Sequence, residues 1–254
     1  SSAAQTTNSR SDSSSRDGMG GYKAGEVASA IAVNVILEHV QQALQQQPPE
    51  VLDEDSGYCM GTLMLRDAIT KANGIIHQTA QSQPQCQGMG TTLAAVLFYD
   101  NRCSIAHVGD SRVYRQRDGQ LQQLTADHSL LQELIEKGFY TPEEARHSVQ
   151  KNLVTRALGV EETVRSELQE EPVAGADLFL LCSDGLSDAV EDEQIHLIIE
   201  QHSANLEQIA DSLIQAANRG GGNDNVSVVL AKTVRPFPAG SAGTWYSKVI
   251  NWFS

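Results

Sequence analysis

The stretch Leu178-Phe179-Leu180-Leu181-Cys182-Ser183-Asp184-Gly185 does most to define both the fold and the site of this chain. Its first five residues are apolar and include large aliphatic side chains, which predicts a buried β-strand over 178–182. An aspartate beside a glycine follows, and this pair favours a sharp turn at the end of a strand. We therefore expect Asp184 at one edge of a central sheet.

Three further aspartates, Asp17, Asp110 and Asp224, have the same placement at turns. Asp110 lies between two predicted strands, Asp224 precedes another, and Asp17 lies in a glycine-rich stretch before a predicted helix. Each alone is typical of an ordinary turn, but four together favour convergence on one point. Converging carboxylates repel one another unless a cation lies between them, and hard divalent cations take oxygen ligands. The sequence therefore predicts a metal site.

Helices and strands surround these turns in a mixed order. Strands that follow one another without a helix favour antiparallel pairing, so we predict an α/β (α+β) sandwich with antiparallel sheet at its centre. The helical stretch 129–158 interrupts the strands, and we interpret it as a surface insertion or flap. The other predicted helices cover 25–47, 61–80, 192–201 and 204–218, and the predicted strands cover 91–99, 103–108, 113–117, 120–124, 164–168, 178–182 and 226–231.

The two ends of the chain differ in composition from its middle. Residues 1–16 contain seven serines and few apolar side chains, which predicts disorder. The tail over 244–254 is rich in aromatic residues; packing on the parent domain is the simpler interpretation, and a partner or membrane-surface contact is the alternative. We divide the chain into a serine-rich segment (1–16), a main domain (17–232) and a linker with an aromatic tail (233–254).

Charge and cysteine spacing limit the function classes. The formal net charge of −14 argues against nucleic acid as a partner, because phosphate backbones need a basic face. The four cysteines show no C-x-x-C spacing, which favours buried thiols in a reducing cytosol over a zinc site or a disulfide scaffold. No apolar run approaches the roughly 20 residues needed to span a bilayer. These features predict a cytoplasmic protein.

Six short pieces of sequence occur in the order found in one enzyme family. They are DGMGG (17–21), GTT (90–92), VGDSR (108–112), LTADH (124–128), SDG (183–185) and DNVSVV (224–229). Over residues 17–232 the chain resembles the metal-dependent protein Ser/Thr phosphatases, the protein phosphatase 2C-like or PPM family, and most closely its bacterial branch.

The resemblance implies a four-layer αββα sandwich, in which two central antiparallel β-sheets are flanked by helix pairs. It implies that Asp17 bridges two metal ions and that the backbone carbonyl of Gly18 joins one metal's shell. Asp184 and Asp224 match ligands of the other ion, so that Asp17, Asp184 and Asp224 form the catalytic set. Asp110, with Asp184, matches a third and weaker metal site. The implied cofactors are Mn²⁺ or Mg²⁺, two ions with a third in the weaker site.

The implied activity is hydrolysis of phosphoserine and phosphothreonine in proteins by a metal-activated water. The implied partners are phosphorylated protein substrates and an opposing bacterial Ser/Thr kinase, and we expect a monomer. Two alternatives stay open at this point. One is a pseudophosphatase, or phosphoprotein-binding module, that binds metal with little turnover. The other is a two-metal hydrolase of nucleotides or small phosphoesters.

The chain departs from the family pattern before Asp17. Family members usually carry a phosphate-contacting Arg and an acidic run on a strand that leads into the Asp-Gly motif. Arg10, Asp12 and Arg16 lie upstream of Asp17 at other spacings, so we assign them no role and leave the substrate-binding residues open. Because the chain begins with Ser1, we interpret it as processed or incompletely represented, with the N-terminal strand region missing.

Four residues near the motifs have more modest predicted roles. Met19 stands where some family members use a histidine as proton donor, so the leaving-group acid is unassigned. We expect a structural role for His128 near the flap, and packing for His107 in the strand before the Asp110 turn. Arg112 is expected to pair with acidic neighbours rather than with substrate.

Overall fold

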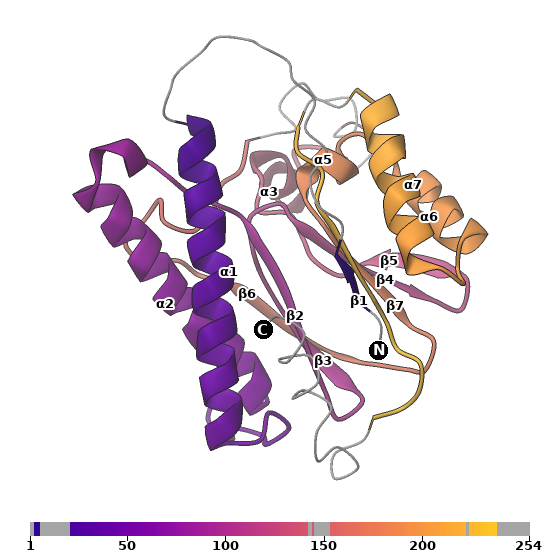
Figure 1. Ribbon diagram of the computed structural model, residues 1–254, viewed down its shortest axis with the longest axis horizontal. Helices are drawn as coiled ribbons and strands as arrows, with labels where there is room; N and C mark the ends of the chain where they lie inside the picture. Colours follow the sequence, from indigo (N-terminus) through magenta and orange to yellow (C-terminus); the bar gives the residue numbers. More distant parts are fainter. Residues whose placement is uncertain (1–2, 6–20, 142–143, 145–152, 222–223, 238–254) are drawn as a thin grey trace.

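Two antiparallel sheets lie at the centre of the fold, with a pair of helices outside each of them (Figure 1). The computed structural model describes residues 3–5, 21–141, 144, 153–221 and 224–237. One sheet has five strands in the order β1-β8-β7-β4-β5, and the other has three in the order β2-β3-β6. The predicted four-layer sandwich is therefore confirmed.

Apart from β1, for which the sequence predicted no strand, the strands and main helices follow the predicted order along the chain. The strands are β1 (Ala3–Gln5), β2 (Leu93–Tyr99), β3 (Arg102–Val108), β4 (Arg112–Arg117), β5 (Gln120–Gln123), β6 (Glu167–Pro172), β7 (Leu178–Cys182) and β8 (Val228–Lys232). The helices are α1 (Gly21–Gln46), α2 (Met60–Ser82), the 3₁₀ turn η1 (Pro84–Cys86), α3 (Leu130–Glu136), α5 (Asp184–Ser187), α6 (Asp192–Gln201) and α7 (Leu206–Arg219).

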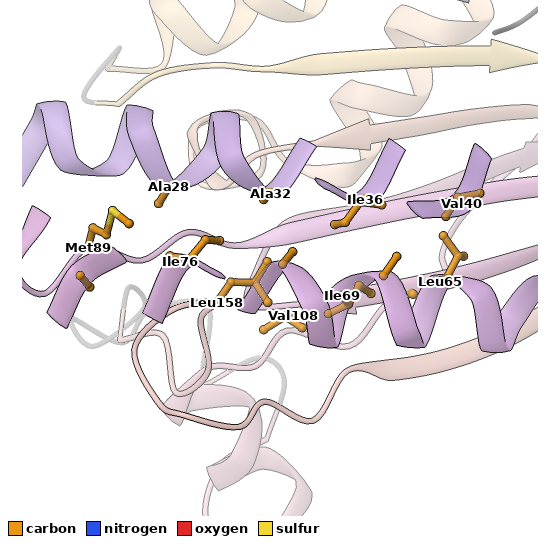
Figure 2. Close-up of a cluster of buried hydrophobic side chains, with 14 of the residues drawn as sticks. Ala28, Ala32, Ile36, Val40, Leu65, Ile69, Ile76, Met89, Val108 and Leu158 are labelled. Carbon is orange, nitrogen blue, oxygen red and sulfur yellow. The ribbon is translucent and has the colours of Figure 1, made fainter. Parts of the chain in front are cut away.

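Helices α1 and α2 cover the three-stranded sheet. Ala28, Ala32 and Ile36 follow one another at i, i+4 spacing on α1, and all three are buried. They pack with residues of α2 such as Ile69 and Ile76 in one hydrophobic cluster (Figure 2). Because alanine side chains are small, the two helices can approach each other closely along this face of α1.

Helix α1 also meets the length and composition criteria for a membrane span. Its segment Ala24–Gln46 reaches a mean hydropathy of 1.3 over the required window, although it contains no uninterrupted apolar run. Length and composition alone are weak evidence, because a core helix can meet the same criteria. In the structure 22% of this window is buried, and the face with Ala28, Ala32 and Ile36 packs in the core cluster.

Helices α6 and α7 cover the five-stranded sheet. The buried stripe of α7 contains Ile209, Leu213 and Ala217, which lie in one cluster with Leu178 and Leu180 of β7. Between the sheets, Phe98 and Phe179 meet edge to face with ring centroids 5.0 Å apart. Each sheet is thus packed on both faces, which holds the strand ends of the sandwich in fixed positions.

Two predicted elements differ from the structure. Ala3–Gln5 forms a strand that pairs with β8, so the expectation of disorder over 1–16 is wrong for these three residues. Backbone hydrogen bonds to an open strand edge do not depend on the side-chain composition from which disorder was predicted. The strand expected over 164–168 lies at Glu167–Pro172, where its register is set by pairing with β3.

Candidate active site

Strand pairing brings three of the predicted aspartates to one end of the five-stranded sheet. Cys182, the last residue of β7, is paired with Arg112 at the start of β4 and with Val228 at the start of β8. Asp184 follows β7 by two residues, Asp110 precedes β4 by two, and Asp224 precedes β8 by four. All three aspartates therefore lie beyond the same end of the sheet, as the turn pattern predicted.

The charges of these aspartates act on one another. Burial raises the pKa of Asp184, and the negative charge of Asp224 raises it further. Burial also raises the pKa of Asp110 to about 6, with a further contribution from the charge of Asp184. These shifts mean that the carboxylates are crowded in a partly dehydrated place where negative charge is disfavoured.

Asp188 adds a fourth negative charge that the sequence analysis did not single out. It raises the pKa of both Asp110 and Asp184. Asp188 lies four residues after Asp184, at the C-terminal cap of the short helix α5, and residues four apart lie on the same side of a helical turn. That spacing is a sequence signal that could have identified Asp188.

Close backbone contact fixes the loops that carry Asp184 and Asp224. The Ser183 hydroxyl donates to the Asn225 carbonyl at 3.0 Å and accepts from the Ser227 amide at 3.0 Å. A Cβ added to Gly185 would lie 2.5 Å from the carbonyl oxygen of Asn225. Glycine is therefore needed there for the two loops to approach each other.

The Asp110 turn links the two sheets, because β3 belongs to one and β4 to the other. Gly109 has φ of +104°, which a residue with a side chain rarely adopts, and a Cβ there would lie 2.4 Å from Thr92 Cγ2. On the other side of Asp110 in the sequence, the Ser111 hydroxyl forms a 2.8 Å hydrogen bond with the hydroxyl of the same residue, Thr92.

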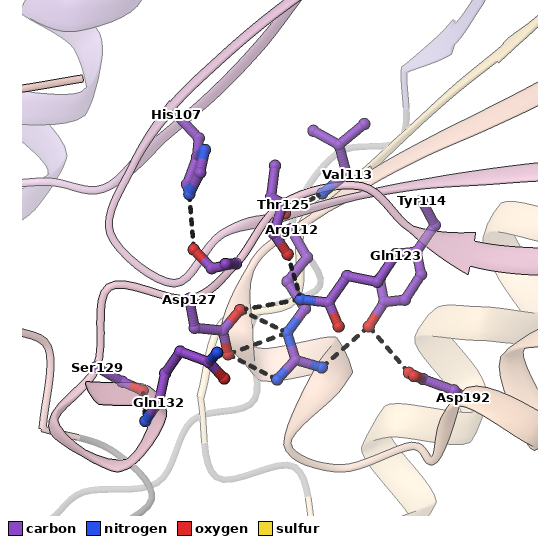
Figure 3. Close-up of polar contacts among 11 residues, drawn as sticks. His107, Arg112, Val113, Tyr114, Gln123, Thr125, Asp127, Ser129, Gln132 and Asp192 are labelled. Atoms are coloured by element: carbon purple, nitrogen blue, oxygen red, sulfur yellow. Dashed lines mark hydrogen bonds and ion pairs between the residues drawn. The ribbon is translucent and has the colours of Figure 1, made fainter. Parts of the chain in front are cut away.

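Arg112, two residues beyond Asp110, belongs to a paired network instead (Figure 3). Its guanidinium donates to both carboxylate oxygens of Asp127, at 2.7 Å from Nη2 and 2.9 Å from Nε. Its Nη1 donates to the Tyr114 hydroxyl at 3.0 Å, and that hydroxyl donates to Asp192 at 2.9 Å. The prediction that Arg112 pairs with acidic neighbours is confirmed, so its charge is already neutralised.

The predicted flap begins and returns beside this network. Ser129 caps α3 by accepting the amide of Gln132, and it forms an isolated bridge with Val154. Helical character was predicted over 129–158, and among the described residues of this stretch it is found in α3 and at Glu144, whose carboxylate accepts hydrogen bonds from Thr141. The prediction is wrong for 137–141 and 153–158, which are not helical. Residues 142–143 and 145–152 lie outside the described residues.

Asp17 and Gly18 also lie outside the described residues, so their placement stays a prediction. Among the residues that are described, Asp110, Asp184 and Asp224 form no ion pair with a lysine or arginine. These three carboxylates offer only oxygen donors, and such a donor set fits a hard divalent cation. The residues present therefore fit the metal ions that the sequence resemblance implied.

Comparison with known sequences agrees with this geometry. The family model described as protein phosphatase 2C matches residues 14–230. The serine/threonine protein phosphatase PstP of Mycobacterium tuberculosis is 42% identical over 222 residues, which is 86% of this chain and 39% of that protein. This chain therefore spans about two fifths of that relative's length. The serine/threonine phosphatase stp of Listeria welshimeri is 37% identical over 216 residues, 85% of this chain and 82% of that protein.

Solved structures have the same fold. The crystal structure of the Mycobacterium tuberculosis serine/threonine phosphatase PstP/Ppp has a TM-score of 0.76 and 36% identity, covering 92% of this chain and 98% of that one. The catalytic domain of PstP in complex with two manganese ions has a TM-score of 0.73 and 36% identity, covering 92% and 97%. On sequence and structure alike, the chain is a member of the protein phosphatase 2C family, and these relatives are bacterial.

Proposed function

We propose that this chain hydrolyses phosphoserine and phosphothreonine in proteins, with Mn²⁺ or Mg²⁺ held by Asp184, Asp224 and Asp17. Family membership supports the reaction class, and the names of the Mycobacterium and Listeria relatives support a protein substrate. The main domain over 17–232 is the proposed catalytic unit. A bacterial Ser/Thr kinase that supplies the phosphorylated substrate is the proposed opposing enzyme, and the cytoplasm is the proposed compartment.

The observation that carries this proposal is the crowding of carboxylates at the sheet end. Asp110 and Asp184 come from separate segments, yet the charge of Asp184 raises the pKa of Asp110, and the charges of Asp224 and Asp188 raise the pKa of Asp184. A fold that stabilised only itself would gain by spacing these charges apart or pairing them with a cationic side chain. Among the described residues, neither Asp110 nor Asp184 forms an ion pair with a lysine or arginine, and carboxylates kept together in this way are typical of a site that is completed by a bound cation.

The chain's own residues have distinct tasks in this proposal. Asp184 and Asp224 hold and orient the cations, while Gly185 allows their two loops to meet. Asp110, with Asp184, provides a further and weaker position. Bound Mn²⁺ or Mg²⁺ would supply an activated water and offset negative charge on the phosphoryl oxygens. Arg112 is paired with Asp127, so it is not proposed as the phosphate-binding cation.

The test is phosphate release from a phosphothreonine peptide with and without Mn²⁺. Wild-type protein should release phosphate only with the metal, and Asp184→Asn should abolish the release. Calorimetric Mn²⁺ titration of the same samples distinguishes the pseudophosphatase alternative, because metal binding without phosphate release would contradict catalysis. Turnover of nucleotides or small phosphoesters, but not of phosphopeptide, would replace the proposed substrate class.

A further inference from the structure

His128 lies directly behind the Asp110 turn. Its side chain is only 5% exposed, and its Nδ1 accepts the backbone N–H of Gly109 at 3.1 Å. Its own backbone N–H donates to the carbonyl of Gly109 at 2.9 Å. His128 therefore binds both the backbone N–H and the backbone carbonyl of Gly109, the residue before Asp110.

The direction of these hydrogen bonds defines the state of the ring. A backbone amide can only donate, so Nδ1 of His128 is unprotonated and the proton of the neutral ring resides on Nε2. Nε2 lies 3.2 Å from a carboxylate oxygen of Glu167, which can accept this proton, and 3.3 Å from Nη1 of Arg156, which can only donate. Burial, the neighbouring His107 and the guanidinium of Arg156 lower the pKa of His128, while Glu167 raises it, and the net direction is downward. The ring is thus held in the neutral form that can accept from Gly109.

The same residue is connected to the base of the flap. The carbonyl of His128 accepts the amide of Thr155 at 2.8 Å, where the chain returns from the flap. His107 stacks on the ring of His128, with centroids 4.6 Å apart and planes 26° apart. Nε2 of His107 donates to the carbonyl of Ala126 at 2.8 Å and so fixes the segment that carries His128.

A metal ion is a poorer explanation for this cluster, although His107, His128 and Glu167 have ligand atoms within 4.8 Å of one another. A ring nitrogen binds a metal through a lone pair in the ring plane. These nitrogens already have partners in Gly109, Ala126 and Glu167.

We propose that His128 is a positioning residue, which holds the Gly109 peptide so that the Asp110 carboxylate faces Asp184 and connects this turn to the base of the flap. The catalytic consequence rests on the proposed phosphatase function, whereas the positioning itself does not. The proposal differs from a general packing role because it assigns the effect to one atom, Nδ1, and to one partner, the Gly109 amide.

The test compares two substitutions of similar polarity, His128→Asn and His128→Gln. The side-chain oxygen of asparagine can occupy the position of Nδ1 and accept from Gly109, whereas the longer glutamine places its amide near the position of Nε2. In metal-free protein, hydrogen exchange of the Gly109 amide, measured by NMR, should stay near the wild-type rate in His128→Asn. In His128→Gln it should accelerate at least about tenfold, because the amide loses its acceptor.

The second readout is Mn²⁺ affinity by calorimetry. His128→Gln should weaken the weaker binding step by about tenfold, as removal of a partner behind a metal ligand typically does, and His128→Asn should restore most of it. The matched control is His196→Gln on α6, whose Nδ1 contacts Gln116 and which should change neither readout.

Equal behaviour of the two His128 variants, whether both resemble wild type or both lose protection and affinity to the same degree, would overturn the proposal. A wild-type protein that binds Mn²⁺ but releases no phosphate would refute the proposed function alone. The exchange and affinity comparison would still decide the role of His128.

Discussion

Asp110 and Arg112 are two residues apart, but they belong to regions with opposite electrostatics. Around Arg112 the charged groups are matched, since its guanidinium binds Asp127 through two nitrogens and reaches Asp192 through Tyr114. Around Asp110 negative charge accumulates instead, because the charges of Asp184, Asp127 and Asp188 all raise the pKa of Asp110. Strand β4 thus begins with Arg112 in a network of paired charges, and the crowded carboxylate of Asp110 lies two residues before it.

This difference separates structural charge from functional charge. The matched, half-buried pair Arg112–Asp127 holds β4 to the segment before the flap, and its charges need no further ligand. A crowded set of carboxylates is costly until a cation binds, so its presence in the metal-free chain indicates a ligand. Substitutions in the two regions should therefore have opposite signatures, with activity affected in one and stability in the other.

The largest effect is expected for Asp184→Asn. Removing this carboxylate should lower the rate of phosphopeptide hydrolysis with Mn²⁺ by at least about 100-fold, or roughly 3 kcal/mol of transition-state stabilisation. The metal-free protein should unfold at the same or higher temperature than wild type, because repulsion with Asp224 is relieved. Steady-state kinetics and thermal melts in EDTA measure the two effects.

The matched control for Asp184→Asn is Asp118→Asn, in the turn between β4 and β5. Asp118 has φ of +50°, a conformation that asparagine also adopts readily, so this variant should keep wild-type activity. A clear loss of metal-free stability in Asp184→Asn would contradict the assignment of Asp184 to the crowded region.

The next effect in size is expected for Arg112→Ala, and it should be on stability. The substitution leaves the carboxylate of Asp127 partly buried without its cation and removes a donor to Tyr114, so unfolding should become easier by about 2–3 kcal/mol. Denaturant unfolding in EDTA measures this. Arg112→Lys should restore only part of it, because an ammonium cannot make the two-point contact. If stability were unchanged while the rate fell, Arg112 would belong to the reaction instead.

A smaller effect is expected for Gly185→Ala. The new Cβ would lie 2.5 Å from the carbonyl oxygen of Asn225, so the loops carrying Asp184 and Asp224 must move apart. We expect Mn²⁺ affinity to fall by about tenfold, a typical effect of disturbing the support of metal ligands. Gly74→Ala is the control, because nothing lies within 4 Å of a Cβ at this position in α2. Unchanged Mn²⁺ affinity in Gly185→Ala would show that loop contact does not set the site.

Strand pattern and turn residues explain why much of this site could be predicted from sequence. The apolar run 178–182 coincides with β7, and the Asp-Gly pair after it lies at the sheet end. Local sequence defines such a strand and its turn, because apolar residues and glycine act at the position where they occur. Arg112 was also correctly expected to pair with acidic neighbours.

Features that depend on distant contacts could not be predicted in the same way. The pairing of Ala3–Gln5 with β8 depends on an available strand edge, which the composition of residues 1–16 does not reveal. The contact between His128 and Gly109 joins residues 19 apart, and only the register of the folded chain brings them together. Asp188 lies at the cap of a four-residue helix rather than beside a glycine turn, so the turn pattern does not identify it; its i+4 spacing from Asp184 does.

The smallest expected effect is the pH dependence of the weaker Mn²⁺ binding step. Burial and the charge of Asp184 raise the pKa of Asp110 from 3.8 to about 6, so in metal-free protein this carboxyl destabilises the fold above pH 6. That destabilisation disappears as the pH falls through 6 towards 3.8, because the neutral form suits the site.

Mn²⁺ needs the ionised form of Asp110, so the Mn²⁺ affinity should fall by about tenfold per pH unit below 6. Mn²⁺ titrations between pH 5 and 7.5 measure this, and NMR titration of the Asp110 carboxyl should show its pKa lowered in Asp184→Asn. An affinity that stays constant between pH 5 and 6 would mean that Asp110 belongs with the matched charges rather than with the crowded ones.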